Sequence, residues 1–235
     1  MLPYFYIQNY NPAEDLIQID ESNSKHIVQV LRMQSGDSLH LTDGKGHLIT
    51  GEITIADKRH CVVKKINQVF TPREGRKVSI AVSLLKNTSR FEWLLEKAIE
   101  IGVVQIIPLL CHRTEKEKFK TDRLQGICVS ALLQSRQVWL PTLQEPTHFN
   151  TIDSWRSKSG SLFIAHCEPS AKKLISTIDK SVLDETMIAI GPEGDFTPDE
   201  IKLAEKNGFA SVGLGDTRLR TETAAIVAIT LLRLG

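Results

Sequence analysis

The chain has 235 residues, of which 29 are lysine or arginine and 28 are aspartate or glutamate, so its formal net charge is +1. Apolar residues make up 41% and charged residues 24%, values of an ordinary globular protein that exclude the disordered and collagen-like classes. No run approaches the roughly 18 apolar residues that a membrane span needs, and the first residues lack the pattern of a secretory signal. We therefore expect a cytoplasmic protein without a membrane anchor.

The four cysteines, Cys61, Cys111, Cys128 and Cys167, are scattered along the chain and form no CxxC pair. Three of them sit in apolar runs, which is typical of buried, reduced thiols in a cytosolic protein. We expect no metal site.

The composition changes at residues 70–77, where TPREGRK combines proline, glycine and basic residues. Such a stretch is typical of a domain boundary, and we place two domains at residues 1–72 and 73–235. In the first domain, Ser24 is the expected N-cap of a short helix. Asp43-Gly44-Lys45-Gly46 predicts a turn. Short apolar and alternating stretches predict strands that would form a small barrel, at Ser38–Thr42, Leu48–Ile55 and Cys61–Val69.

The second domain alternates apolar runs with stretches of helical periodicity, a pattern that indicates an α/β fold with a largely parallel sheet. The expected strands are Val78–Leu85, Val103–Leu110, Leu162–Cys167, Met187–Ile190 and Ser211–Leu214. One expected helix begins at Ser89 and ends before Gly102. Three more cover Thr121–Val138, Ala171–Ile178 and Glu222–Leu234. A further helix is expected after Thr197, because Thr197 and Glu200 have the spacing of a capping box, with Pro198 at the first helical position.

Two glycine-bearing segments each begin where an expected strand ends: IGPEGDF at 190–196 and GLGDTRLRTETA at 213–224. One such segment is usually an ordinary turn, but two in one domain favour a shared ligand site at the carboxyl ends of the strands. The dinucleotide motif fails because Arg218 stands where its third glycine belongs, and no GxxxxGK[ST] phosphate loop is present. Glu193 and Asp195 would repel phosphate, so the loops favour an adenosyl group over a polyphosphate.

Arg218, Arg220 and Glu222 lie at the start of the last expected helix and allow two interpretations. In the first, Glu222 complements the helix dipole and the arginines are solvated. In the second, Arg220 faces an anionic substrate while Glu222 holds that substrate or a proton in place.

These segments carry a family resemblance. IGPEGDFTPDEI (190–201) and GLGDTRLRTETAAIVAI (213–229) resemble the ribosomal small-subunit methyltransferase E family, within the SPOUT superfamily of knotted methyltransferases. HIVQVLRMQSGD (26–37) and RFEWLLEKAIEIGVVQIIPL (90–109) resemble it too, so the likeness covers almost the whole chain. The chain departs from the family pattern at Leu133–Gln137, where Gln134 alone keeps its register.

The resemblance implies an N-terminal PUA-like barrel that binds RNA, followed by a parallel sheet tied in a deep trefoil knot. It also implies a homodimer, S-adenosylmethionine as the cofactor, and methylation of N3 of one uridine in 16S rRNA of the small ribosomal subunit. Arg220 would stabilise charge on a uracil carbonyl oxygen, and Glu222 would orient Arg220 or take the N3 proton. The cofactor residues implied are Ala165, His166, Ile190, Gly191, Pro192, Glu193, Gly194, Leu214, Gly215, Leu219, Arg220, Thr221 and Thr223.

Basic residues gather at 73–97 and 112–136, whereas residues 1–72 carry seven basic against eight acidic side chains. Such runs are often solvated helix faces, or they contact RNA phosphates. Our candidates for RNA contact are His26, Arg32, Lys86, Arg90, Arg113 and Gln134. Two rival functions stay open at this point: a non-catalytic RNA-binding or ribosome-assembly protein, and an unrelated α/β enzyme that binds a small nucleotide.

Overall fold

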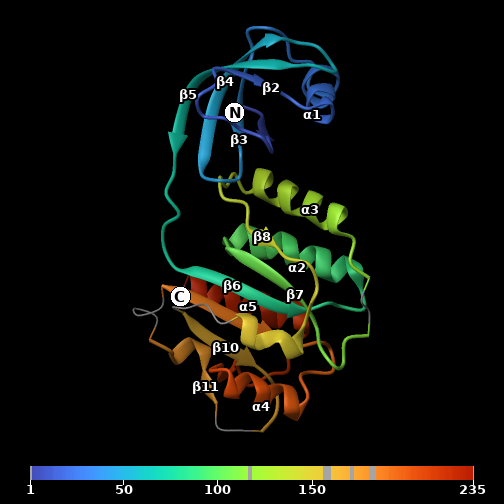
Figure 1. The fold of residues 1–235 in the computed structure, drawn as a ribbon, viewed down its shortest axis with the longest axis vertical. Helices are drawn as coiled ribbons and strands as arrows, with labels where there is room; N and C mark the ends of the chain where they lie inside the picture. The colour runs from blue at the N-terminus through green and yellow to red at the C-terminus, as the bar shows by residue number, and fades with distance from the viewer. Residues whose placement is uncertain (1, 116–117, 156–159, 170–171, 180–183, 235) are drawn as a thin grey trace. The chain divides into compact units, whose positions relative to one another are not determined.

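The computed structural model describes residues 2–115, 118–155, 160–169, 172–179 and 184–234 (Figure 1). The chain forms two compact units. The N-terminal unit comprises Met1–Glu74 with Leu132–Leu140, and the C-terminal unit comprises Gly75–Ala131 with Pro141–Gly235. No helix in the described part of the chain is long and apolar enough to cross a bilayer.

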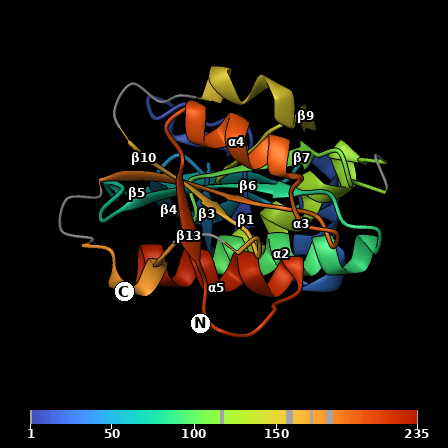
Figure 2. The ribbon, with the colours of Figure 1, turned by 90° about the horizontal axis from the view of Figure 1, so that it is seen from below.

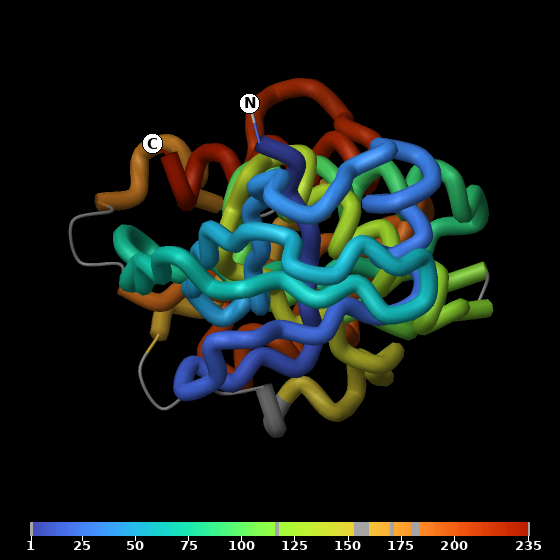
Figure 3. The backbone as a smooth tube through the Cα atoms, turned by 90° about the horizontal axis from the view of Figure 1, so that it is seen from above, coloured from blue at the N-terminus to red at the C-terminus, as the bar shows by residue number. Residues whose placement is uncertain are grey.

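The described residues of the N-terminal unit form a five-stranded sheet in the order β1-β3-β4-β5-β2, whose backbone Figure 3 follows in blue and cyan. β1 pairs with β3 in parallel, and the other neighbours are antiparallel. The three longer strands confirm the predicted ones, whereas β1 and β2 are too short to show an alternating pattern and were missed. The strands are β1 (Tyr4–Tyr6), β2 (Leu16–Gln18), β3 (Ser38–Thr42), β4 (His47–Ile55) and β5 (Val62–Phe70).

The predicted short helix begins earlier than expected. α1 (Glu21–Lys25) is capped by Asp20, whose carboxylate accepts a backbone N–H, and it continues into one π-helical stretch, η1 (His26–Val30). Ser24 is buried inside α1, and its hydroxyl accepts a hydrogen bond from the backbone N–H of Cys61 at 3.1 Å. The prediction that Ser24 is the N-cap was wrong because this hydroxyl ties the helix to the sheet.

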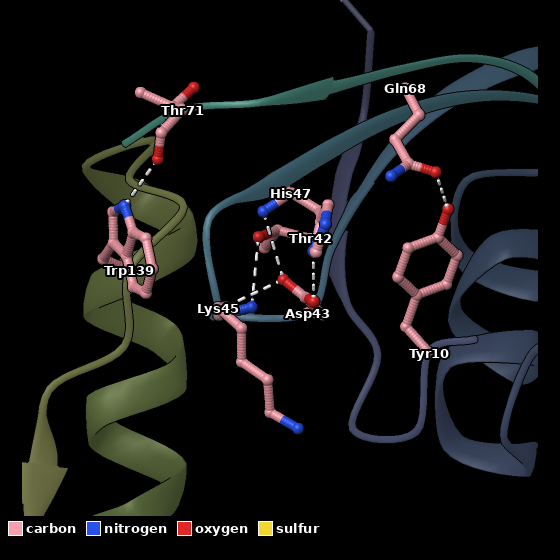
Figure 4. Close-up of polar contacts among 9 residues, drawn as sticks. Tyr10, Thr42, Asp43, Lys45, His47, Gln68, Thr71 and Trp139 are labelled. Carbon is pink, nitrogen blue, oxygen red and sulfur yellow. Dashed lines mark hydrogen bonds and ion pairs between the residues drawn. The ribbon is translucent and has the colours of Figure 1, made fainter. Parts of the chain in front are cut away.

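The predicted turn at residues 43–46 is organised by a buried carboxylate (Figure 4). Asp43, only 4% exposed, accepts the backbone N–H of Lys45 at 2.8 Å and pairs with Nδ1 of His47 at 2.7 Å. Nearby, Trp139 donates its indole N–H to the carbonyl of Thr71 at 2.8 Å. Through such contacts residues 132–140 belong to the N-terminal unit although they lie far along the chain.

The described residues of the C-terminal unit form an eight-stranded sheet in which β11-β13-β10-β12-β6-β7-β8 are neighbours and β9 also pairs with β7. Every pairing is parallel. The predicted α/β class with a parallel sheet is confirmed, and the trefoil knot stays a prediction. The strands are β6 (Lys77–Ser83), β7 (Gln105–Leu110), β8 (Thr142–Leu143), β9 (Thr147–His148), β10 (Ser161–Ala165), β11 (Lys173–Leu174), β12 (Glu185–Ile190) and β13 (Ala210–Gly213).

Helices cover both faces of this sheet (Figure 2). α4 (Pro198–Lys206) and the 3₁₀ segment η2 (Phe149–Trp155) lie on one face, and α2 (Thr88–Ile101) and α5 (Thr221–Arg233) lie on the other. Phe149, Phe196 and Ile201 belong to the buried core on the α4 side. The capping box predicted at the start of α4 is present.

Two helix predictions need correction. α3 (Thr121–Gln134) ends four residues before Val138, because Arg136 adopts a φ of 54° that a helix cannot continue through. The helix predicted at 171–178 is wrong: Ala171 lies outside the described residues, and β11 pairs with the sheet edge before one 3₁₀ turn, η3 (Ile175–Thr177).

Candidate active site

The two glycine-bearing loops come after β12 and β13, two strands of the C-terminal sheet that are separated by one strand. β10 lies between β12 and β13, and its last residue, Ala165, is in register with Ile190 of β12 and Val212 of β13. The three strands therefore end at the same level, and the segments that follow them must meet at the carboxyl edge. The two loops therefore lie at one edge of the sheet, and their binding of a common ligand stays a prediction.

These segments enclose a cavity of about 690 Å³. Of the predicted cofactor residues, all but Gly194 and Thr223 line it, and Arg90 of α2 lines it as well. Sequence patterns missed Cys167, Lys172 and Leu174, because they lie in a segment without a recognisable motif. The predicted residues on the wall are Ala165, His166, Ile190, Gly191, Pro192, Glu193, Leu214, Gly215, Leu219, Arg220 and Thr221.

The loop after β12 is folded tightly against the start of the next segment. A Cβ at Gly191 would lie 3.0 Å from the backbone nitrogen of Phe196, a distance that side-chain-bearing residues rarely tolerate. Asp195 has a φ of 64°, and its Oδ2 accepts the backbone N–H of Cys167 at 2.7 Å. Asp195 therefore ties the loop after β12 to the segment after β10.

Two further contacts hold the same loop from the other side. Oε1 of Glu193 accepts the backbone N–H of Lys86 at 3.3 Å. Arg113, which we expected to contact RNA, donates from Nη1 to the carbonyl of Gly194 at 2.6 Å. The acidic loop is thus fastened by three segments of the C-terminal unit, and two of its carboxylates accept backbone N–H groups.

His166 is a buried side chain, 7% exposed, on the wall of the cavity. The hydroxyl of Ser211 donates to Oε1 of Glu205 at 2.8 Å, so its oxygen accepts from Nε2–H of His166 at 3.0 Å. Nδ1 is then an acceptor, and it has no partner among the described residues. Burial, and secondly the Lys172 ammonium, lower the pKa of His166 and favour the neutral ring.

The carboxylate of Glu222 meets a different arginine from the one the sequence suggested. Its Oε1 lies 3.7 Å from Nε of Arg90, and the Glu222 side chain is 11% exposed. Glu222 is not among the described residues that line the cavity, whereas Arg90 and Arg220 both are. Arg220 is exposed at the N-cap of α5, where its side chain makes no capping hydrogen bond.

The six candidate RNA residues divide between the units. His26, Arg32 and Gln134 belong to the N-terminal unit, and each is exposed. In the C-terminal unit, Lys86 forms an ion pair with Glu115 at 2.7 Å, beside Arg90. Arg113 supports the loop after β12, as described above.

The cysteines are all free thiols, but only three are buried. Cys61, Cys111 and Cys128 match the expectation, and burial raises the pKa of Cys128 to about 12. Cys167 is exposed and lies on the wall of the cavity, which corrects the prediction for this position. In the described part of the chain, no three histidine, cysteine or acidic side chains gather as metal ligands would.

Comparison with known proteins places this architecture in a family. Residues 72–233 match the RNA methyltransferase domain, and residues 19–66 match the RNA methyltransferase PUA domain. The ribosomal RNA small subunit methyltransferase E of Rickettsia conorii is 28% identical over 97% of this chain and 94% of its own.

Two crystal structures are similar over nearly the full length. A probable rRNA-methyltransferase from Porphyromonas gingivalis has a TM-score of 0.89 and 34% identity, covering 99% of this chain and 98% of that chain. Ribosomal RNA small subunit methyltransferase E from Neisseria gonorrhoeae, bound to S-adenosyl methionine, has a TM-score of 0.87 and 25% identity, covering 98% and 96%. The chain with the two glycine loops therefore belongs to the ribosomal RNA small subunit methyltransferase E family.

Proposed function

We propose that the chain transfers a methyl group from S-adenosylmethionine to N3 of a uridine in 16S rRNA of the small ribosomal subunit. The observation that carries this proposal is the cavity that both glycine loops form at the carboxyl ends of β10, β12 and β13, in a chain of this family. When bound, S-adenosylmethionine supplies a methyl group on an electrophilic sulfonium centre.

The residues of the cavity fit this cofactor. Its volume of about 690 Å³ lies within the range of small-molecule sites, and Gly215, where a Cβ would meet nothing within 4 Å, leaves its backbone open to a ligand. His166 contributes a buried ring to the wall, and its burial favours the neutral form. Glu193 and Asp195 on the wall suit a cationic ligand and disfavour a polyphosphate.

Arg220 is our candidate for stabilising the substrate. Transfer of the N3 proton of uridine to water leaves a negative charge that N3 shares with the two carbonyl oxygens of the base, and N3 then accepts the methyl group. Arg220 lines the cavity and is exposed, so its guanidinium is free to turn toward this charge as the methyl group is transferred. Preorganised donors of this kind contribute strongly to catalysis, because they need no rearrangement as charge develops.

For Glu222 we propose a positioning role. Its carboxylate is largely enclosed and lies beside the Arg90 guanidinium, away from the described wall of the cavity. Glu222 therefore orients Arg90, whose side chain reaches the same cavity as Arg220. This assignment revises the sequence-based hypothesis that Glu222 orients Arg220 or takes the N3 proton.

The test combines methylation with cofactor binding. Purified protein, labelled S-adenosylmethionine and small-subunit rRNA should yield one labelled uridine, which mass mapping identifies as N3-methylated. Arg220→Ala should lose methylation at least about 100-fold and keep its affinity for S-adenosylmethionine in calorimetry. A wild-type protein that binds S-adenosylmethionine and RNA but methylates neither free rRNA nor the assembled subunit would contradict the enzymatic function and support an assembly role.

We also propose that residues 1–72 bind the RNA while residues 73–235 carry the transfer, in keeping with the PUA and methyltransferase matches. His26, Arg32 and Gln134 are the proposed RNA contacts of the N-terminal unit. Replacing Arg32 by alanine should raise the KM for rRNA and leave cofactor affinity unchanged. An unchanged KM would remove Arg32 from the RNA surface.

A homodimer is proposed from the outer side of α5. The inner side of this helix is buried against its own chain, at Ala225, Ala228 and Ile229. Ile226 and Val227 are only half-buried, so they are available to a second copy. Sedimentation equilibrium should give twice the chain mass, and Val227→Asp should shift the mass to that of one chain. A monomeric wild type would overturn this proposal.

A further inference from the structure

Two more cavities continue from the cofactor cavity along the start of α2. The second cavity is lined by residues 86–90 with Glu115 and Glu193, and it shares Arg90 and Glu193 with the first. The third cavity, of about 370 Å³, shares Thr88 and Ser89 with the second. Because adjacent cavities share wall residues, the three lie in a row that leads away from the proposed site of methyl transfer.

The third cavity has an apolar floor. Leu84, Leu85, Phe91 and Leu124 line it, and none of the four is more than 4% exposed. Phe119 also lines it and is half-buried. The cavity therefore combines an aromatic side chain with buried apolar residues, a composition that suits the face of a planar ring.

The rim of the third cavity is cationic. Arg123 forms two hydrogen bonds with the Glu92 carboxylate, at 2.6 and 2.9 Å, so these two charges compensate each other. Lys118 and Lys120 are exposed on the same rim, and in the described part of the chain neither has a salt-bridge partner. Two positive charges thus remain beside the apolar floor.

We propose that the third cavity binds a nucleotide of the substrate RNA strand that lies a short distance along the strand from the target uridine. The base of this nucleotide stacks on Phe119, and its phosphate faces Lys118 and Lys120. Single-stranded RNA is bound in this way, by aromatic stacking combined with cations along the backbone. The inference rests on the proposed function, because it is the continuity with the cofactor cavity that sets the position of the strand.

The second cavity lets the strand pass. Lys86 and Glu115 form an ion pair across it at 2.7 Å, but their side chains are 73% and 58% exposed. Exposed ion pairs contribute little, so a backbone phosphate can replace Glu115 as the partner of Lys86. The proposal does not use the backbone N–H groups at the start of α2 to bind the phosphate, because the Ser89 N–H already donates to Oδ1 of Asn87 at 2.9 Å.

The experiment compares two double variants of equal charge change. Lys118→Ala with Lys120→Ala removes the rim cations, and Lys202→Ala with Lys206→Ala removes two exposed cations from α4, on the other face of the sheet (Figure 2). The rim variant should raise the Kd for 16S rRNA in fluorescence anisotropy, and the KM in methylation, about 10-fold or more. The slope of log affinity against log salt should fall by about one, and the affinity for S-adenosylmethionine in calorimetry should not change.

Phe119 supplies an independent test of stacking. Phe119→Ala should weaken RNA affinity about 5- to 150-fold, the usual range for one lost base stack, and Phe119→Tyr should restore it. If the rim variant and Phe119→Ala both have the same Kd for RNA as the Lys202/Lys206 control, the third cavity is not an RNA site. This conclusion holds whether or not the wild type methylates RNA. If instead the wild type binds RNA without methylating it, the proposed function fails while the anisotropy comparison still decides the cavity.

Discussion

Replacement of Asp195 by alanine should loosen the loop after β12 and weaken cofactor binding. The variant loses the charge-assisted hydrogen bond from the Cys167 N–H to the half-buried Asp195 carboxylate at 2.7 Å, which contributes about 1.5 kcal/mol. Alanine is also unfavourable at a φ of 64°, which costs about 1 kcal/mol more. If both free-energy costs destabilise only the loop conformation that binds the cofactor, the Kd for S-adenosylmethionine rises about 70-fold.

Calorimetric titration with S-adenosylmethionine measures this effect. Asp195→Asn should recover most of the affinity, since asparagine tolerates positive φ and keeps an acceptor oxygen. Asp199→Ala is the matched control, because Asp199 is 96% exposed and makes only a 4.0 Å ion pair with Lys202. An Asp195→Ala protein that binds the cofactor as tightly as the Asp199→Ala protein would refute the role given to this loop.

Three further changes have defined outcomes. Gly46→Ala should destabilise the protein by about 1–3 kcal/mol in urea unfolding, because its Cβ would lie 2.6 Å from the Trp139 ring. Gly126→Ala is the control and should not destabilise the protein, because a Cβ there would have nothing within 4 Å. Thr197→Ala should lower the free energy of unfolding by about 1 kcal/mol through loss of the α4 cap, seen as a lower Tm. Burial lowers the pKa of His166, so the unfolded chain takes up its proton first as the pH falls below about 6.5. The wild type should therefore lose more stability between pH 7.5 and 5.5 than His166→Gln, and equal losses would contradict a buried neutral ring.

Local patterns were sufficient to predict most of the fold, and they failed where a distant residue decides the structure. The α4 capping box and the strands β3, β4 and β5 depend on neighbours in sequence, and they were predicted to within one or two residues. Ser24 has the residue type of an N-cap, but its hydroxyl bonds to Cys61 far along the chain. The helix expected near 171–178 was lost to β11, whose pairing with β13 is likewise non-local.

The site was predictable for a similar reason and to a similar extent. Glycine loops at strand ends indicated a shared ligand site, and the family resemblance named most of the residues that line the cavity. The partner of Glu222 could not be named, because Arg90 and Glu222 are brought together only when α2 and α5 pack on the same face of the sheet. Arg113 was named as a cation for RNA because its sequence neighbours are basic, and that role stays a prediction. Its bond to the Gly194 carbonyl could not be predicted, because the two residues lie 81 positions apart.

The contacts of the loop after β12 explain how an acidic, glycine-containing loop can form one wall of a binding site. Glu193, Gly194 and Asp195 are each bonded to a different segment, through Lys86, Arg113 and Cys167. A loop fixed at three successive residues loses little conformational freedom when a ligand arrives, so less of the interaction free energy is spent on ordering. The same contacts connect the loop to the start of α2, because Lys86 and Arg90 line the second cavity. Cofactor affinity and the position of the RNA strand should therefore change together when Glu193 is replaced, and separately when Lys118 or Asp195 is replaced.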